Sequence, residues 1–249
     1  MKSSIFLLEI FLCVVAVHTS HAGVFFSEGY EAYRPNEIWA TDAGGTGGWA
    51  VWPTAAVIEN KVVQTGMNSK RSLSIFNPGE EAVYLRSLGN LVSREWKNAV
   101  EKAKTVNARF SFYIPKEMAA KQGSLFTVYF EQKGDEPLTS AMLTVANDPR
   151  QGLVVLASNG PGDGFVAWET AGKWDFDKWV TVEVNQRFHD RTYDIRVDKQ
   201  PTCKNCNFRN AVSWPEDLWG KAAQWSFSIA PGTKVNFDDL SLSTEQKEH

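Results

Sequence analysis

The amino-acid sequence predicts an all-β protein in which two sheets pack face to face as a sandwich. Apolar and polar residues alternate in several segments, which is typical of strands that bury one face and expose the other. These segments are residues 110–114, 125–132, 179–186, 192–198, 225–229 and 235–242. Turn-forming clusters of glycine, proline and asparagine separate them. Many strands with little helix favour a sandwich.

One segment has helical periodicity instead. Ser93 can cap a helix over residues 94–104, because a serine side chain can accept a hydrogen bond from a free N–H of the first turn. Four residues of this segment form one apolar stripe: Trp96, Ala99, Val100 and Ala103. We expect the stripe to seal the sandwich and not to recognise a partner.

The first 22 residues have the features of an export signal peptide. Lys2 gives a positive start, residues 5–17 form an apolar stretch, and residues 20–22 resemble a cleavage site. Glu9 interrupts the apolar stretch, so a buried N-terminal strand or helix is the alternative interpretation. We predict a mature chain that starts at Gly23 and is secreted, into the extracellular space or, in a bacterium, the periplasm.

After the signal peptide, the sequence predicts one domain over residues 23–243 and a polar tail over residues 244–249. The domain holds no apolar stretch long enough to span a bilayer, so we expect no membrane span in the mature chain. The formal net charge of −3 and the pI of about 5.9 argue against nucleic acid as the main partner.

Two cysteines, Cys203 and Cys206, remain in the mature chain. A zinc site needs two further ligands, whereas His189 is the one histidine left inside the domain. In an oxidising compartment, such a pair favours a disulfide that pins a small loop, with redox chemistry as the alternative.

Several motifs follow one another in a recognisable order along nearly the whole mature chain. They are the opening residues 26–33, the tryptophan at Trp49, the pair of segments 62–66 and 72–75, the hairpin 178–198, and the closing Val-Asn-Phe-Asp-Asp-Leu-Ser-Leu of residues 235–242. This order resembles that of the concanavalin A-like lectin and glucanase domains of secreted proteins, the LamG-like jelly rolls. The sequence departs from that pattern after Asp198, where residues 199–212 replace a short turn.

The resemblance implies an antiparallel jelly-roll sandwich whose concave face often holds carbohydrate. The family includes lectins, carbohydrate-binding modules, glycoside hydrolases and polysaccharide lyases, so the fold alone does not decide the function. Laminarinase-type hydrolases of this fold carry a Glu-x-Asp-x-Glu pattern that aims two carboxylates at one groove. This sequence lacks that pattern and the lyase motifs, and we predict no catalytic residue.

We expect a carbohydrate site on the concave face. The six candidate residues are Tyr129, Glu131, Glu183, Arg196, Trp49 and Trp168. For the charged candidates the alternative is an ordinary solvated sheet face, and for the tryptophans it is a core position under the loops. The same two interpretations apply to Trp39, Trp52 and Trp174.

The resemblance also implies a structural calcium ion between the first and last strands. Glu28, Asp238 and Asp239, with Glu31 nearby in sequence, would supply the hard oxygen ligands that calcium prefers. Ordinary surface carboxylates are the alternative. We expect no other cofactor.

The leading functional hypothesis is a secreted, non-catalytic carbohydrate-binding or surface-recognition domain. One alternative is a polysaccharide-active enzyme, a hydrolase or lyase with a non-standard site. For a hydrolase, Glu131 and Glu183 would have to lie about 5 to 10 Å apart in one cleft. The other alternative is a structural or adhesion protein, which would expose an apolar patch.

Overall fold

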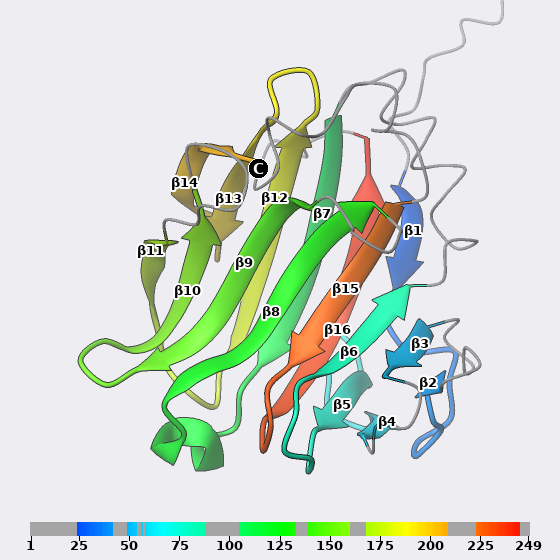
Figure 1. The fold of residues 1–249 in the computed structure, drawn as a ribbon. Coiled ribbons are helices and arrows are strands. Elements are labelled where there is room, and N and C mark those ends of the chain that lie inside the picture. The colour runs from blue at the N-terminus through cyan, green and yellow to red at the C-terminus, as the bar shows by residue number, and fades with distance from the viewer. Residues whose placement is uncertain are drawn as a thin grey trace, which may run out of the picture.

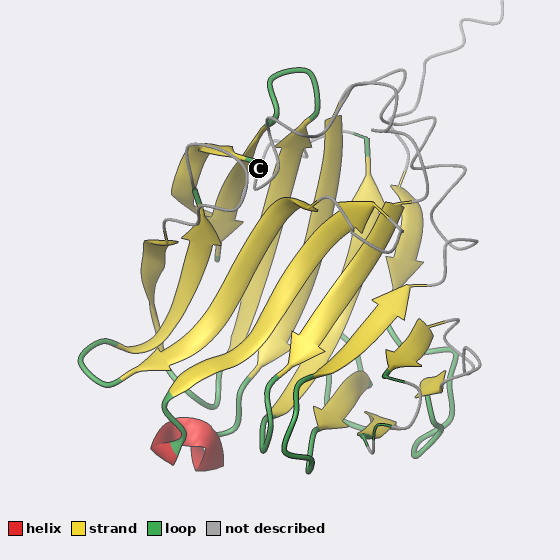
Figure 2. Ribbon diagram, in the orientation of Figure 1, coloured by secondary structure: helices red, strands yellow, loops and turns green. Residues whose placement is uncertain are grey.

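The computed structural model describes residues 24–41, 49–53, 56, 58–87, 105–132, 139–159, 168–208 and 223–244. Within these ranges the chain is mostly strand, and its one helical element is the 3-10 turn η1 (Lys116–Ala120), drawn red in Figure 2. The expected signal peptide and the expected helix over residues 94–104 lie outside the described residues. No helix within the described ranges is long and apolar enough to cross a membrane.

Eight strands form the sheet nearer the viewer in Figure 1, which we call the front sheet. Neighbouring strands are antiparallel, except for β2 and β3, which pair in parallel. In spatial order the strands are β11 (Trp168–Trp174), β10 (Gly152–Ser158), β9 (Thr139–Asp148), β8 (Gly123–Gln132), β15 (Ala223–Ile229), β6 (Val83–Ser87), β3 (Trp49–Trp52) and β2 (Ala40–Thr41).

The second sheet, the back sheet, lies behind the first and is antiparallel throughout. In spatial order its strands are β14 (Gln200–Asn207), β13 (Thr192–Val197), β12 (Trp179–Arg187), β7 (Thr105–Tyr113), β16 (Lys234–Ser243), β5 (Ser72–Phe76) and β4 (Glu59–Val63), and β1 (Val24–Glu28) also pairs with β16. The predicted two-sheet β-sandwich is therefore confirmed.

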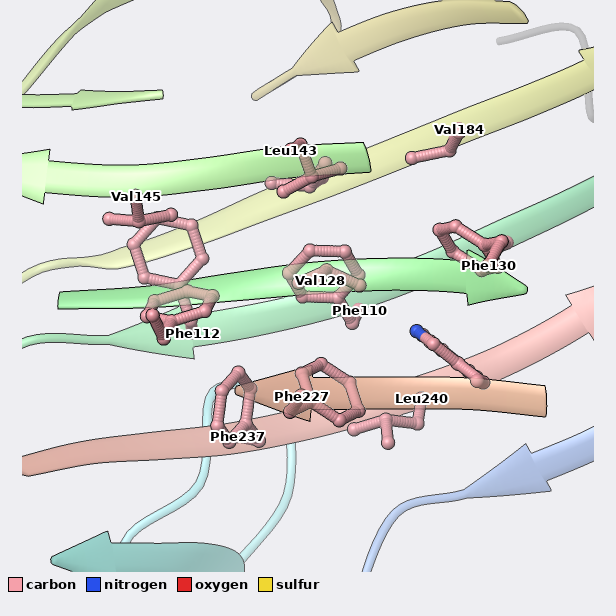
Figure 3. Close-up of a cluster of buried hydrophobic side chains, with 14 of the residues drawn as sticks. Phe110, Phe112, Val128, Phe130, Leu143, Val145, Val184, Phe227, Phe237 and Leu240 are labelled. Atoms are coloured by element: carbon pink, nitrogen blue, oxygen red, sulfur yellow. The ribbon is translucent and has the colours of Figure 1, made fainter. Parts of the chain in front are cut away.

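Aromatic rings from both sheets fill the space between them (Figure 3). Phe227 of the front sheet lies 4.7 Å from Phe237 of the back sheet, measured between ring centroids. Phe126 lies 5.2 Å from Phe112 and 5.1 Å from Phe237. All four side chains are at most 2% exposed. Each such edge-on or tilted pair contributes about 0.5–1.5 kcal/mol beyond the burial of its area.

The cysteine pair lies in β14, at the edge of the back sheet. Cys203 is paired with Ile195 and Cys206 with Tyr193, so β14 carries one more residue than β13 between these two positions. The two cysteines are buried and joined by a disulfide across a Cα–Cα distance of 6.2 Å. The disulfide therefore pins a β-bulge in an edge strand, and not the loop expected from the sequence.

A polar network holds the outer side of this bulge. Arg187 donates hydrogen bonds to the Asp194 carboxylate at 2.5 and 3.0 Å, and to the side-chain oxygen of Asn205 at 2.8 Å. The Asn205 backbone N–H also donates to Asp194, at 2.7 Å. Burial on its own would raise the pKa of Asp194. The hydrogen bonds from Arg187 and Asn205, with the nearby positive charges, hold this pKa below its ordinary value.

A bulge at a sheet edge discourages pairing with a second chain. The ring that the disulfide closes is small, so the disulfide constrains the unfolded chain little. We predict that a Cys203→Ala, Cys206→Ala double variant folds and loses at most about 2 kcal/mol of unfolding free energy, the loop-entropy value for so short a ring. Urea unfolding and limited proteolysis would measure this, with faster cleavage expected within β14. A larger loss, or two reactive thiols in the wild-type protein, would contradict the prediction.

The Asp194 network also predicts how stability depends on pH. A carboxylate whose pKa is lowered by folding stabilises the folded state above its unfolded pKa of about 3.8, and this contribution is lost as the pH falls through the folded pKa. Asp194→Asn should therefore cost about 1 kcal/mol at pH 7. Because wild-type Asp194 becomes protonated in acid, the difference should shrink below pH 3.8. Asp175→Asn is the control, because Asp175 pairs with Lys178 on the exposed surface and does not contact Arg187. An equal loss from both variants at pH 7 would contradict the prediction.

Candidate functional site

The outward side of the front sheet, called the front face, carries side chains aligned in rows across the strands. One row, given by the strand register, is Trp52, Tyr84, Ser228, Thr127, Thr144 and Leu156. The next row is Ala50, Arg86, Ser226, Tyr129 and Met142. Both rows run at right angles to the strands. In the second row Ser226 and Met142 are buried, so a ligand that crosses the sheet would follow the first row.

Trp52, Tyr84, Arg86 and Tyr129 gather on this face, and we call them the platform. The Arg86 guanidinium lies over the Trp52 ring at 4.6 Å and over the Tyr84 ring at 5.1 Å. The Trp52 and Tyr84 rings are edge to face at 5.4 Å, and Tyr84 lies 6.4 Å from Tyr129. Trp52 is 47% exposed, so much of its indole is open to solvent.

Strand alternation places these side chains outward. In β3, Trp49 and Val51 are buried while Trp52 is exposed. In β6, Val83 and Leu85 are buried, so the intervening Tyr84 and Arg86 are directed to the other side of the sheet. Between Tyr84 and Tyr129, strand β15 presents the small side chains of Ser226 and Ser228 to this face, which lets the two tyrosine rings approach each other across it.

A depression of about 570 Å³ lies beyond the platform, over β8, β9 and β10. Thr127 and Thr144 share a hydrogen bond of 2.8 Å between their hydroxyls in its wall, and Val154 and Leu156 supply apolar surface. Asp148, at its end, accepts hydrogen bonds from backbone N–H groups of its own turn. The front face therefore combines aromatic, hydroxyl and apolar surface with one guanidinium.

The six predicted site residues do not share one face. Tyr129 belongs to the platform, whereas Glu183 and Arg196 lie opposite each other on β12 and β13 of the back sheet. Trp49 is 0% exposed and packs against Trp39, so it occupies the core and not a ligand surface. The remaining two, Glu131 and Trp168, belong to β8 and β11, and their side chains lie outside the description.

The two carboxylates that a hydrolase would need, Glu131 and Glu183, lie in different sheets. Glu131 belongs to the front sheet and Glu183 to the back sheet. Glu183 lies between Arg109 and Arg196 in the register of the back sheet, and its carboxylate is 3.9 Å from the Arg109 guanidinium. That arrangement is a charged, partly solvated sheet surface, the alternative interpretation of Glu183.

Two platform residues, Tyr84 and Arg86, were missed at the sequence level. Their segment, Val-Tyr-Leu-Arg-Ser over residues 83–87, does alternate and has the signal of a short strand. Trp52 was weighed as a sugar-stacking or core residue, and its 47% exposure favours the surface position. Trp174 is partly buried against the core.

Two carboxylates of the expected calcium site, Glu28 and Asp238, lie near the buried Tyr30. The pKa of the Tyr30 hydroxyl is raised by its burial and further by the charges of Glu28 and Asp238. Glu28 accepts hydrogen bonds from the Tyr30 N–H at 2.9 Å and the Tyr33 hydroxyl at 2.7 Å.

The two aspartates also accept hydrogen bonds from the protein. Asp238 accepts from the Met67 N–H at 2.8 Å and the Ser69 hydroxyl at 3.0 Å, and Asp239 accepts from the Asn68 amide at 3.0 Å. Within the described ranges no three Asp, Glu, His or Cys side chains converge as metal ligands. The contacts therefore do not form a three-carboxylate cluster, and calcium binding here stays a prediction from the resemblance.

Comparisons with known proteins identify the fold. No protein-family model matches the chain, and no curated protein matches it. Among solved structures, it is similar to the conserved carbohydrate esterase of the Shiga toxin-encoding bacteriophage phi24B, with a TM-score of 0.57 and 13% identity over 90% of this chain and 99% of the other.

Two further likenesses are weaker. The globular domain of T. cruzi calreticulin has a TM-score of 0.50 and 10% identity, over 90% of this chain and 89% of that domain. A sialidase has the same TM-score and identity, over 78% of this chain, which spans only 17% of the sialidase. At such identities the likeness shows the fold alone. Fold and front face together define a two-sheet β-sandwich protein with a candidate ligand-binding sheet face.

The calcium prediction can be tested by removal of the ion. An ion shared by Glu28 and Asp238 or Asp239 would bind only the folded chain, so excess chelator should lower the Tm, and added calcium should restore it. Differential scanning calorimetry of wild-type protein would measure the change, with Asp175→Asn, far along the chain on an exposed turn, as a control variant that responds like wild type. An unchanged melting curve would contradict the calcium prediction and would mean that the hydrogen bonds described above hold these carboxylates without an ion.

Proposed function

We propose that this chain is a secreted, non-catalytic carbohydrate-binding protein that binds its ligand on the front face. The observation that carries the proposal is the platform, in which Trp52 is 47% exposed and is held in place by Arg86 and Tyr84. A sugar ring has an apolar face of C–H groups and an equator of hydroxyls. An aromatic ring can stack on the apolar face, and nearby hydroxyl and guanidinium groups can form hydrogen bonds with the sugar hydroxyls.

Large exposed aromatic side chains are uncommon among the residues that the structure describes. Within the described ranges, the exposed large hydrophobic residues are Val24, Ile38 and Trp52. Trp52 differs from the other two because its neighbours on the sheet are also aromatic or cationic. Trp52 is therefore exposed within a cluster of aromatic and cationic side chains, and such a cluster favours a role in binding over an isolated exposed residue without function.

The chemistry of this surface favours binding over catalysis. Of the described side chains that form the platform and the depression, one is a carboxylate, Asp148, and its Oδ1 accepts two hydrogen bonds within its own turn. Hydrolysis of a glycosidic bond generally uses two carboxyl groups on either side of the bond.

The resemblance to concanavalin A-like domains and the printed description of the phage protein as a carbohydrate esterase support the proposal at the level of fold. They do not point to a particular sugar. Membership of the concanavalin A-like group is part of the same proposal, and it rests on the order of sequence motifs and the two-sheet architecture.

The test is binding of the purified mature chain to a panel of soluble polysaccharides, measured by affinity electrophoresis and calorimetry. Trp52→Ala should weaken binding at least about tenfold, the loss typical of a central aromatic anchor. Trp179→Ala is the matched control, since it removes a partly buried tryptophan from the back sheet. Circular dichroism would confirm that both variants fold.

Binding to no polysaccharide by folded wild-type protein would overturn the proposed function. Binding that survives Trp52→Ala but is lost in Trp179→Ala would move the site to the back sheet. Release of reducing ends or unsaturated sugars from a bound polysaccharide would show an enzyme instead.

A further inference from the structure

The charge of Arg86 is not neutralised by any described residue. Its guanidinium contacts the rings of Trp52 and Tyr84, and its Nε is buried and has no hydrogen-bond partner. The two rings attract the guanidinium by cation–π contact, but they do not neutralise its charge, and partial burial has removed some of its water. Such a group gains more than an ordinary surface arginine when an anion approaches.

Two arginines of the back sheet have carboxylate partners. Arg187 has an ion pair with Asp194 at 2.5 Å, and Arg109 has one with Glu183 at 3.9 Å. Arg109 also has a buried Nε without a hydrogen-bond partner, but its guanidinium has a carboxylate within 4 Å. Arg86 differs from Arg187 and Arg109 because two aromatic rings, and no described carboxylate, contact its guanidinium.

The two rings also restrict the orientation of the guanidinium. A planar guanidinium presents parallel N–H donors, which match the two oxygens of a carboxylate or a sulfate. Because Trp52 and Tyr84 hold the group on the front face, less rotational freedom is lost when an anion binds. Selectivity for an acidic group over a neutral hydroxyl follows from the charge.

The shape of the front face indicates a polymer. The row from Trp52 to Leu156 crosses six strands, or five strand spacings, a distance of about 24 Å at about 4.8 Å per spacing. The platform lies at one end of this row, and the depression lined by Thr127 and Thr144 lies at the other. A single sugar would contact only one of the two.

We propose that the ligand is an acidic polysaccharide whose carboxylate or sulfate group binds Arg86. In this arrangement a neighbouring sugar ring stacks on Trp52, and the chain continues across the strands over Thr127 and Thr144. The proposal rests on the proposed function and adds the chemical class of the ligand.

The test compares ligands that differ only in charge. Polygalacturonate and its fully methyl-esterified form share one backbone, and dextran sulfate and dextran form a second pair for the sulfate arm. Single-stranded DNA serves as a polyanion that is not a glycan. Affinities of wild type, Arg86→Gln, Arg86→Lys and Arg196→Gln would be measured by calorimetry at two salt concentrations, with circular dichroism to verify folding.

We expect wild type to prefer the acidic member of at least one pair by about tenfold or more, the scale of one charge-assisted hydrogen bond. Arg86→Gln should reduce binding of the acidic form to the level of the neutral one. Arg86→Lys should retain part of the preference, because it keeps the charge but loses the planar donor set. Arg196→Gln should behave like wild type, since it removes a back-sheet cation.

Equal affinity for the charged and neutral members in wild type, with no effect of Arg86→Gln, would overturn this inference and leave the proposed function standing. Binding to no glycan in the panel would overturn both. Binding of DNA as tight as that of the acidic glycan, with the same dependence on Arg86, would replace the acidic-glycan site with a general polyanion site.

Discussion

The contact between the inner faces of the two sheets is the interaction on which the rest of this structure depends. Phe110, Phe112 and Phe237 of the back sheet contact Phe126 and Phe227 of the front sheet in a buried aromatic layer. Because successive side chains of a regular strand point to opposite faces of the sheet, fixing the inward residues also fixes the outward ones. The positions of Tyr84 and Arg86 on the surface therefore follow from the burial of Val83 and Leu85.

The two sheets share one core, but their outer faces differ in chemistry. The back sheet carries charges that neutralise one another, as at Arg187 and Asp194, and its edge is closed by a disulfide-pinned bulge. The front face carries aromatic rings and hydroxyl groups around an unpaired guanidinium. Paired charges on a sheet contribute to solubility, whereas an unpaired, ring-held cation next to an open indole is suited to a ligand.

The sequence was sufficient for the fold class because the strands that face water on one side alternate clearly. Residues 179–186 and 192–198, for example, were recognised and are β12 and β13. Strand β9 was missed because it is buried along nearly its whole length, so its sequence, Thr-Ser-Ala-Met-Leu-Thr-Val-Ala-Asn-Asp, does not alternate between apolar and charged residues.

The site was harder to predict than the fold, since it depends on which sheet each strand joins. Alternation shows that Glu183 and Tyr129 face away from the core, but strand order decides that they do so on opposite sides of the molecule. Trp49 and Trp52 illustrate the same limit at short range. Both lie in one four-residue strand, yet one is 0% and the other 47% exposed.

The central claim is that carbohydrate binds the front face through the platform. The most direct measurement is the indole N–H region of a nitrogen-15 NMR spectrum during titration with an acidic oligosaccharide, with the Trp52 signal assigned from a Trp52→Phe variant. We expect a saturable shift of the Trp52 signal, while the signals of the buried Trp49 and Trp225 stay in place. A shift confined to Trp179 of the back sheet, with Trp52 unmoved, would contradict it.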